Sequence, residues 1–190
     1  MSLLPLLSGR AGASSGTDAS TTTEAPTTTS SPPRRPTDDD ASLLGFAQGM
    51  ELAIRELFDL GLSMGGWADA QSTVVLTVRE AHEAFAQALA GLLGRQAPGV
   101  ADAALVASLR PAFSTSPNEF LTAAYELESA AVATHAELLA SLQGIEGAAL
   151  VASIQSAEAR HCTVLADLAG VTDDAILLVD EEAKSLAGNG

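Results

Sequence analysis

The sequence predicts an all-α protein: an antiparallel bundle of four helices with one long crossover, preceded by a disordered tail. The 190-residue chain is 47% hydrophobic but only 4% aromatic, and a core rich in alanine and leucine favours closely packed helices over a β-sandwich. Apolar residues recur at spacings of three and four from residue 42 onward. We therefore divide the chain into a tail (1–41), a bundle (42–172) and a short C-terminal helix with its own tail (173–190).

The tail consists mostly of serine, threonine, proline and glycine between residues 13 and 36. Such a segment has too few apolar residues to offset its ordering entropy, and its composition is typical of stalks at cell surfaces. The apolar run Leu3–Leu7 and the small residues Ala11–Ala13 resemble parts of a secretion signal, although a basic region and a longer apolar core are missing. Two interpretations stay open: the truncated remnant of an export signal, which would place the protein outside the cytoplasm, or a plain cytoplasmic tail.

Each helix is expected from its apolar stripe and from the residues at its ends. Three aspartates, Asp38–Asp40, precede the first helix and supply negative charge and a cap. Ser116–Glu119 combines a capping box with proline at the first helical position of the third helix. Gly94 and Gly170 end the second and fourth helices. The helices are expected over residues 42–62, 69–93, 116–142 and 148–168, with a short helix at 101–109 in the crossover and a weaker one at 173–186.

Charge and composition exclude several classes of partner. The net charge of −15 repels phosphate backbones and anionic lipid headgroups, so we expect neither nucleic acid nor a membrane surface as partner. No segment approaches the roughly 20 apolar residues of a membrane span. The single cysteine, Cys162, permits neither an intramolecular disulfide nor a cysteine-based zinc site. The oligomeric state stays open between a homodimer and a complex with an unidentified protein.

Ionisable residues occupy positions where the helical stripes call for apolar ones. They are all three histidines of the chain and two glutamates: His82, Glu128, His135, Glu158 and His161. An ionised carboxylate in a bundle core costs several kcal/mol unless it is paired or coordinated. Glu158 and His161 form a Glu-x-x-His pair on one helical face. Di-metal carboxylate bundles use such a pair from each of two helices and one glutamate from each of the other two. Carboxylate and imidazole ligands suit iron and manganese.

The second helix does not complete this pattern. Glu128 would supply the single glutamate of the third helix, and Glu51 that of the first. From Glu83 in the second helix, the expected histidine would fall at position 86, which is Ala86. This half of the site therefore lacks a ligand or uses His82 in an altered register. The metal hypothesis names Glu51, Glu83, Glu128, Glu158 and His161 as ligands, with His82 and His135 as replacement ligands or as groups that orient a ligand.

Two motifs in the second half of the chain resemble the bacterial ferritin-like domain family, many of whose members are exported and of unassigned function. Residues 153–161, which end in Glu-Ala-Arg-His, resemble the motif of that family's last helix. Leu127-Glu128 resembles the third-helix motif, in which a tyrosine usually follows seven residues after the glutamate. His135 stands at that position here.

The first half of the bundle resembles the family more loosely. Met50-Glu51 resembles the first-helix Leu-Glu, and residues 81–83 resemble the second-helix motif, where Glu83 would be a ligand and Ala86 replaces the expected histidine. The resemblance spans residues 43–170 and implies a ferritin-like fold with di-iron binding, while the alanine argues against a complete di-iron centre. Two hypotheses follow: a protein that holds one or two iron or manganese ions for metal handling or oxygen-dependent oxidation, or a metal-free surface bundle whose Glu/His cluster is purely hydrogen-bonded.

Overall fold

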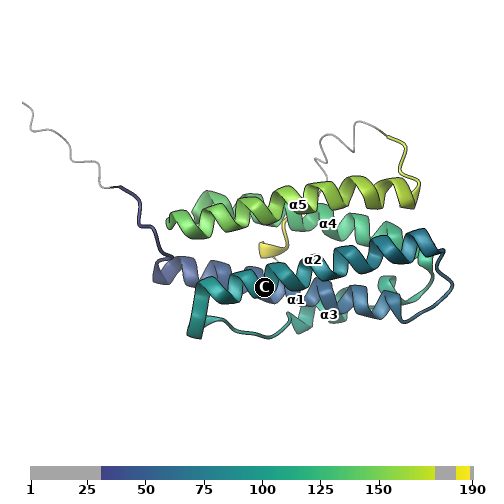
Figure 1. The fold of residues 1–190 in the computed structure, drawn as a ribbon, viewed down its shortest axis with the longest axis horizontal. Coiled ribbons are helices and arrows are strands. Elements are labelled where there is room, and N and C mark those ends of the chain that lie inside the picture. The colour runs from purple at the N-terminus through teal and green to yellow at the C-terminus, as the bar shows by residue number, and fades with distance from the viewer. Residues whose placement is uncertain (1–30, 174–182, 189–190) are drawn as a thin grey trace, which may run out of the picture. The chain divides into compact units, whose positions relative to one another are not determined.

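The structure is a computed structural model that describes residues 31–173 and 183–188. Within these residues the secondary structure is entirely helical (Figure 1). The helices are α1 (Asp38–Leu62), α2 (Asp69–Leu93), α3 (Ala103–Leu109), α4 (Pro117–Ser141) and α5 (Ile145–Ala169), with 3₁₀ turns η1 (Gly94–Gln96), η2 (Ala112–Ser114) and η3 (Leu186–Gly188). Most of the predicted tail and the predicted helix at 173–186, apart from its two ends, lie outside the described residues.

The four long helices form two antiparallel hairpins, α1–α2 and α4–α5, which pack against each other (Figure 1). At one end of the bundle Trp67, just before α2, lies edge-on to Phe120 of α4 with ring centroids 5.1 Å apart. At the other end Asp40 of α1 accepts a hydrogen bond from the backbone of Gly144, just before α5. Helices α2 and α4 thus start at one end, α1 and α5 at the other. The crossover, which carries α3, runs the length of the bundle, and this confirms the predicted topology.

Helix α1 begins four residues before its predicted start at Ser42. Thr37 is the N-cap, and it exchanges hydrogen bonds with Asp40 in a capping box. The Asp40 carboxylate is buried and also accepts the backbone N–H groups of Gln143 (2.8 Å) and Gly144 (2.9 Å). Burial opposes the ionisation of Asp40, but these backbone donors outweigh it and lower the pKa. The three aspartates therefore form the first turn of the helix instead of preceding it.

The residues just before α1 cap a second helix. The carbonyl oxygens of Pro33 and Arg34 accept the first N–H groups of α5, from Ile145 and Glu146, at 2.9 Å each. Gly144 has room for no side chain, because a Cβ there would lie 2.7 Å from the backbone oxygen of Arg35. Residues 33–41, which are predicted from the sequence to lie in the tail, thus supply caps for α5 and the first turn of α1.

The core divides into two apolar clusters with a polar layer between them. The larger cluster contains three phenylalanines, Phe58, Phe113 and Phe120, at the end where α2 and α4 start. The smaller cluster, at the other end, contains Leu44, Ala47, Leu89, Leu93, Leu138, Val151 and Ile154. Between them every long helix contributes at least one buried glutamate or histidine. The polar layer is therefore shielded from bulk water along the bundle axis.

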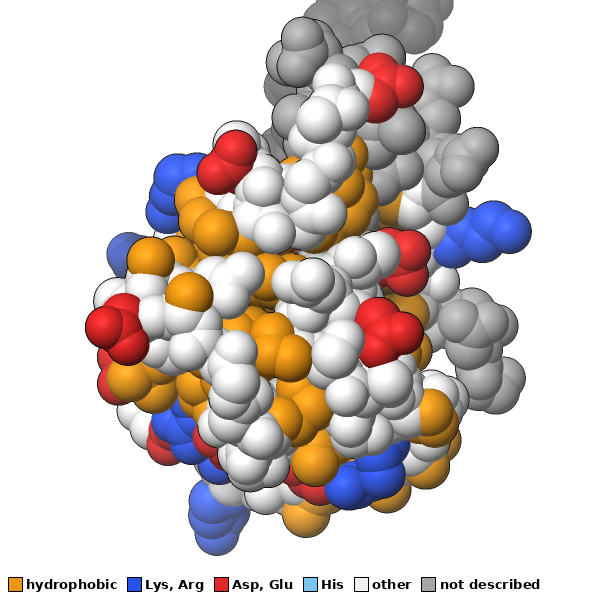
Figure 2. Space-filling view, turned by 90° about the vertical axis from the view of Figure 1, so that its right-hand side faces the viewer, with side chains coloured by type: hydrophobic (Ala, Val, Ile, Leu, Met, Phe, Trp, Pro, Cys, Tyr) orange, Lys and Arg blue, Asp and Glu red, His pale blue; other side chains and the backbone are white. Residues whose placement is uncertain are grey.

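The described surface carries few large apolar side chains. The most exposed are Leu76, Val100, Ile145 and Val164, which lie on α2, the crossover and the two ends of α5. On the face shown in Figure 2, apolar side chains are interspersed with isolated acidic and basic ones. Among the described residues, no helix has the length and apolar composition that crossing a membrane requires.

Candidate metal centre

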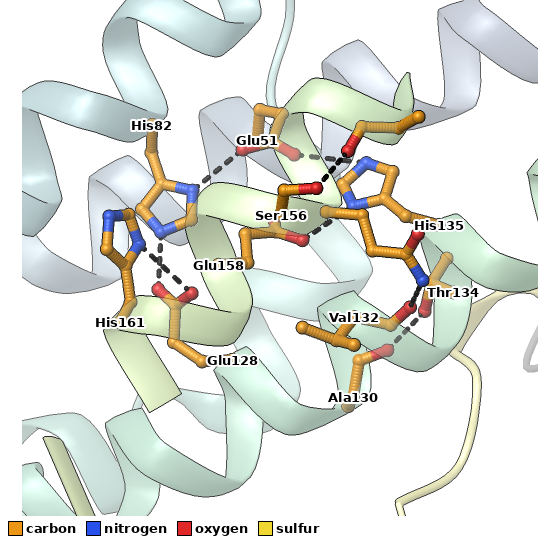
Figure 3. Close-up of polar contacts among 12 residues, drawn as sticks. Glu51, His82, Glu128, Ala130, Val132, Thr134, His135, Ser156, Glu158 and His161 are labelled. Carbon is orange, nitrogen blue, oxygen red and sulfur yellow. Dashed lines mark hydrogen bonds and ion pairs between the residues drawn. The ribbon is translucent and has the colours of Figure 1, made fainter. Parts of the chain in front are cut away.

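The buried polar layer is one connected cluster of three glutamates and three histidines (Figure 3). Its members are Glu51 from α1, His82 from α2, Glu128 and His135 from α4, and Glu158 and His161 from α5. Five of the side chains are fully buried, and the sixth, His161, is 17% exposed. The cluster therefore reaches solvent only at His161.

Carboxylates and imidazoles alternate through the cluster, in the order Glu158, His135, Glu51, His82, Glu128 and His161. Three of the five contacts are short hydrogen bonds. His135 Nδ1 lies 2.7 Å from Glu158 Oε2, and His82 bridges two helices, with Nδ1 2.7 Å from Glu51 Oε2 and Nε2 2.5 Å from Glu128 Oε1. Because the signs alternate, each histidine meets only carboxylates along the chain of contacts.

The other two contacts are longer ion pairs without hydrogen-bond geometry. His135 Nε2 lies 3.3 Å from Glu51 Oε1, and His161 Nδ1 lies 3.3 Å from Glu128 Oε2. These four atoms, together with Oε1 of Glu158, are buried without a hydrogen-bond partner among the described residues. An unsatisfied buried polar atom costs about 1–3 kcal/mol, and native cores hold few of them. Five in one cluster are consistent with ligand atoms that share a cation.

The cluster splits into two groups, in each of which one candidate ligand atom per residue lies within 4.8 Å of the others. The inner group is Glu51, His135 and Glu158, all fully buried. The outer group is His82, Glu128 and His161 and includes the partly exposed histidine. Every residue of the inner group has a buried atom without a hydrogen-bond partner. In the outer group the same holds for Glu128 and His161, but both nitrogens of His82 are already hydrogen-bonded.

Burial and neighbouring charges displace the pKa values of the metal-free cluster in both directions. Burial disfavours the charged form of His82, but the carboxylates of Glu128 and Glu51 outweigh it and raise its pKa well above 6.5. Burial likewise opposes the ionisation of Glu128, yet the charge of His82 lowers that pKa to about 2. For Glu158, burial and then the charge of Glu51 raise the pKa to about 7, despite the hydrogen bond from His135. Glu128 is thus firmly ionised at neutral pH, while Glu158 holds its proton to near neutrality.

Glu83, the ligand expected from the second helix, lies outside the cluster. Its carboxylate pairs with Arg79, which also donates to Asp59 at 2.8 Å, and its side chain is 36% exposed. Adjacent helical residues point about 100° apart, so only one of positions 82 and 83 can face the core. His82 takes that place, and Ala86, one turn further along the same face, is buried. The structure therefore brings His82, and not Glu83, into the cluster.

The two histidines assigned only replacement or orienting roles hold central positions. His82 joins carboxylates from α1 and α4, and His135 joins carboxylates from α5 and α1. The sequence indicated that both histidines face the core, because each stands on a predicted apolar stripe. Cys162 is separate from the cluster: its Sγ lies 3.8 Å from the hydroxyl of Ser129, and burial raises the pKa of the thiol to about 12.

An aromatic ring covers the exposed edge of the cluster. Phe85 of α2 stacks on His161 with ring centroids 6.2 Å apart and an interplanar angle of 19°. The same ring lies edge-on to His82 at 5.7 Å. Phe85 therefore lies against both histidines of the outer group, at the point where the cluster approaches solvent.

Comparison with known proteins shows a family relationship. A family model described as a ferritin-like domain matches residues 39–171, a span that contains all six residues of the cluster. No curated protein and no solved structure matches the chain.

Proposed function

Given that this chain belongs to the ferritin-like domain family, we propose that its Glu/His cluster binds one or two iron or manganese ions. The observation that carries the proposal is a set of five buried carboxylate and imidazole atoms that have no hydrogen-bond partner among the described residues and belong to the two candidate ligand groups. Carboxylate oxygen and imidazole nitrogen are the donors that suit iron and manganese.

The residues present fit such a site with one substitution. Helices α1, α4 and α5 supply Glu51, Glu128 and the Glu158/His161 pair, as in di-metal carboxylate bundles. Helix α2 supplies only His82, and the sixth donor, His135, comes from α4. The cluster therefore keeps six donor residues but replaces one carboxylate with an imidazole.

The surrounding protein favours strong binding. Apolar clusters on both sides of the polar layer exclude water, which strengthens the attraction between carboxylates and a cation. The hydrogen bonds from His135 to Glu158 and from His82 to Glu51 hold the rings in fixed orientations. Iron or manganese held there would supply Lewis acidity and one-electron redox chemistry. The same site supports metal handling and oxygen-dependent oxidation.

A second candidate function rests on the same contacts. Alternating carboxylates and imidazoles compensate one another's charge, with three hydrogen bonds of 2.5–2.7 Å. Such a network can persist in a core without metal. The chain would then be a metal-free member of the family that serves as a structural or partner-binding bundle.

Metal content distinguishes the two functions. The full chain is purified without chelators and exposed anaerobically to Fe(II) or Mn(II), and the bound metal is quantified. We expect stoichiometric metal in the parent and in the control Glu83→Gln, and little in a Glu158→Ala/His161→Ala double variant. Equal and negligible metal in all three folded proteins would refute the proposal and favour the metal-free bundle.

A further inference from the structure

We infer that the inner group, Glu51, His135 and Glu158, is the primary metal position and takes a single divalent cation before the outer group takes any. This inference rests on the proposed function and deepens it. It assigns a ligand role to His135, which stands where the resembling family's third-helix motif has a tyrosine.

The inner group is arranged for binding without loss of an existing hydrogen bond. Each residue is held through one hydrogen-bonded atom, and its other side-chain polar atom has no hydrogen-bond partner. The bonded atom and the other atom are Oε2 and Oε1 in Glu51, Nδ1 and Nε2 in His135, and Oε2 and Oε1 in Glu158. Nε2 of His135 and Oε1 of Glu51 are 3.3 Å apart. Two ligands bound at about 2.1 Å to one ion are separated by a similar distance, roughly 3 Å.

The outer group is less well prepared. Both nitrogens of His82 are engaged, by Glu51 and by Glu128. An ion in the outer group would therefore have to displace the His82–Glu128 contact of 2.5 Å. Breaking a buried charged pair costs free energy. Metal binding in the outer group is therefore weakened by a cost that binding in the inner group does not carry.

Charge points the same way. Two carboxylates and one neutral imidazole match the charge of a divalent cation, so a filled inner group carries no net charge. The outer group has one carboxylate and two imidazoles, and a divalent ion there would leave a net positive charge beside the core. All three inner side chains are fully buried, and an uncompensated charge at this depth is strongly disfavoured. The inner group, with two carboxylates, therefore matches the charge of a divalent cation better than the outer group does.

The experiment is a titration of the metal-free full chain with Mn²⁺, in which free Mn²⁺ is followed by electron paramagnetic resonance. We expect one tight equivalent in the parent. The control Glu83→Gln, outside the cluster, should keep that equivalent with unchanged affinity. His161→Ala, which removes an outer ligand at a partly exposed position, should weaken it only a few-fold. His135→Gln and the near-isosteric Glu158→Gln should each weaken it by at least about 100-fold. Circular dichroism of each variant establishes that the bundle is folded, and Glu158→Gln preserves the test if His135→Gln unfolds.

The outcomes separate this inference from the proposed function. Tight binding that survives in Glu158→Gln but is lost in His161→Ala would overturn the inner position while leaving the protein a metal binder. Two equivalents that bind together and are lost together in both variants would also overturn it, in favour of a paired site. No binding by the parent would refute the proposed function itself.

Discussion

Glutamine substitutions of two buried glutamates should change the stability of the metal-free protein in opposite directions. Glu128 and Glu158 lie in the same polar layer, and both are fully buried. Each substitution replaces a carboxylate with a neutral group of similar shape, so packing is largely conserved. The difference lies in their surroundings: the charge of His82 lowers the pKa of Glu128 to about 2, whereas burial and the charge of Glu51 raise that of Glu158 to about 7.

The magnitude follows from the distance of each pKa from 4.5, the ordinary value. A lowered folded-state pKa means that Glu128 contributes stability above pH 4.5 and loses it as the pH falls toward 2. Its substitution should cost about 3 kcal/mol at pH 8. A raised folded-state pKa means that Glu158 destabilises the fold increasingly as the pH rises from 4.5 to about 7. Its substitution should therefore increase the free energy of unfolding by about 3 kcal/mol at pH 8 and by less than about 1 kcal/mol at pH 5.

The assay is urea unfolding in the presence of a chelator, at pH 5 and pH 8, with Glu83→Gln as a surface control expected to stay within about 0.5 kcal/mol of the parent. Equal losses of stability in Glu128→Gln and Glu158→Gln would show that the two carboxylates share one environment and would refute the reasoning. A stabilised Glu158→Gln protein that no longer binds metal would show that the carboxylate is retained at a cost in stability.

Two further predictions concern access and packing. Phe85→Ala should speed metal uptake several-fold in stopped-flow measurements without changing the final stoichiometry, because the ring covers the exposed edge of the cluster. Phe46→Ala, at a ring that packs against the smaller apolar cluster, should leave the rate unchanged. Equal rates in the two variants would show that the Phe85 ring does not limit access of the metal. Gly61→Ala should destabilise the bundle by about 3 kcal/mol in thermal unfolding, since its Cβ would lie 1.9 Å from the Phe120 ring. Gly91→Ala, where the Cβ meets nothing within 4 Å, should stabilise by about 0.5–1 kcal/mol, and similar losses in both would contradict the packing argument.

The helices were predictable because their signals are local. Ser116 and Pro117 start α4, and Gly170 ends α5 in the left-handed conformation, as expected from residue type. The start of α1 was not predictable in the same way. The Asp40 carboxylate accepts backbone N–H groups from Gln143 and Gly144, which lie more than 100 residues later in the sequence. No pattern within the first helix predicts such partners.

The site was predictable only in part for a related reason. Periodicity placed His82 and His135 on inward faces, but the contacts of His135 with Glu51 and Glu158 depend on how three helices are aligned along the bundle. Spacing within one helix does not determine that alignment. The expected motif pointed to Glu83, whereas the apolar stripe already put His82 on the buried face, and the structure places His82 in the cluster and Glu83 outside it.

The position of bound metal tests the proposed site most directly. Crystals of the full chain grown with Mn²⁺ would be measured at the manganese absorption edge. We predict an anomalous difference peak in the buried cluster, strongest among Glu51, His135 and Glu158. Peaks only at surface carboxylates such as Glu83, with none in the cluster, would contradict it.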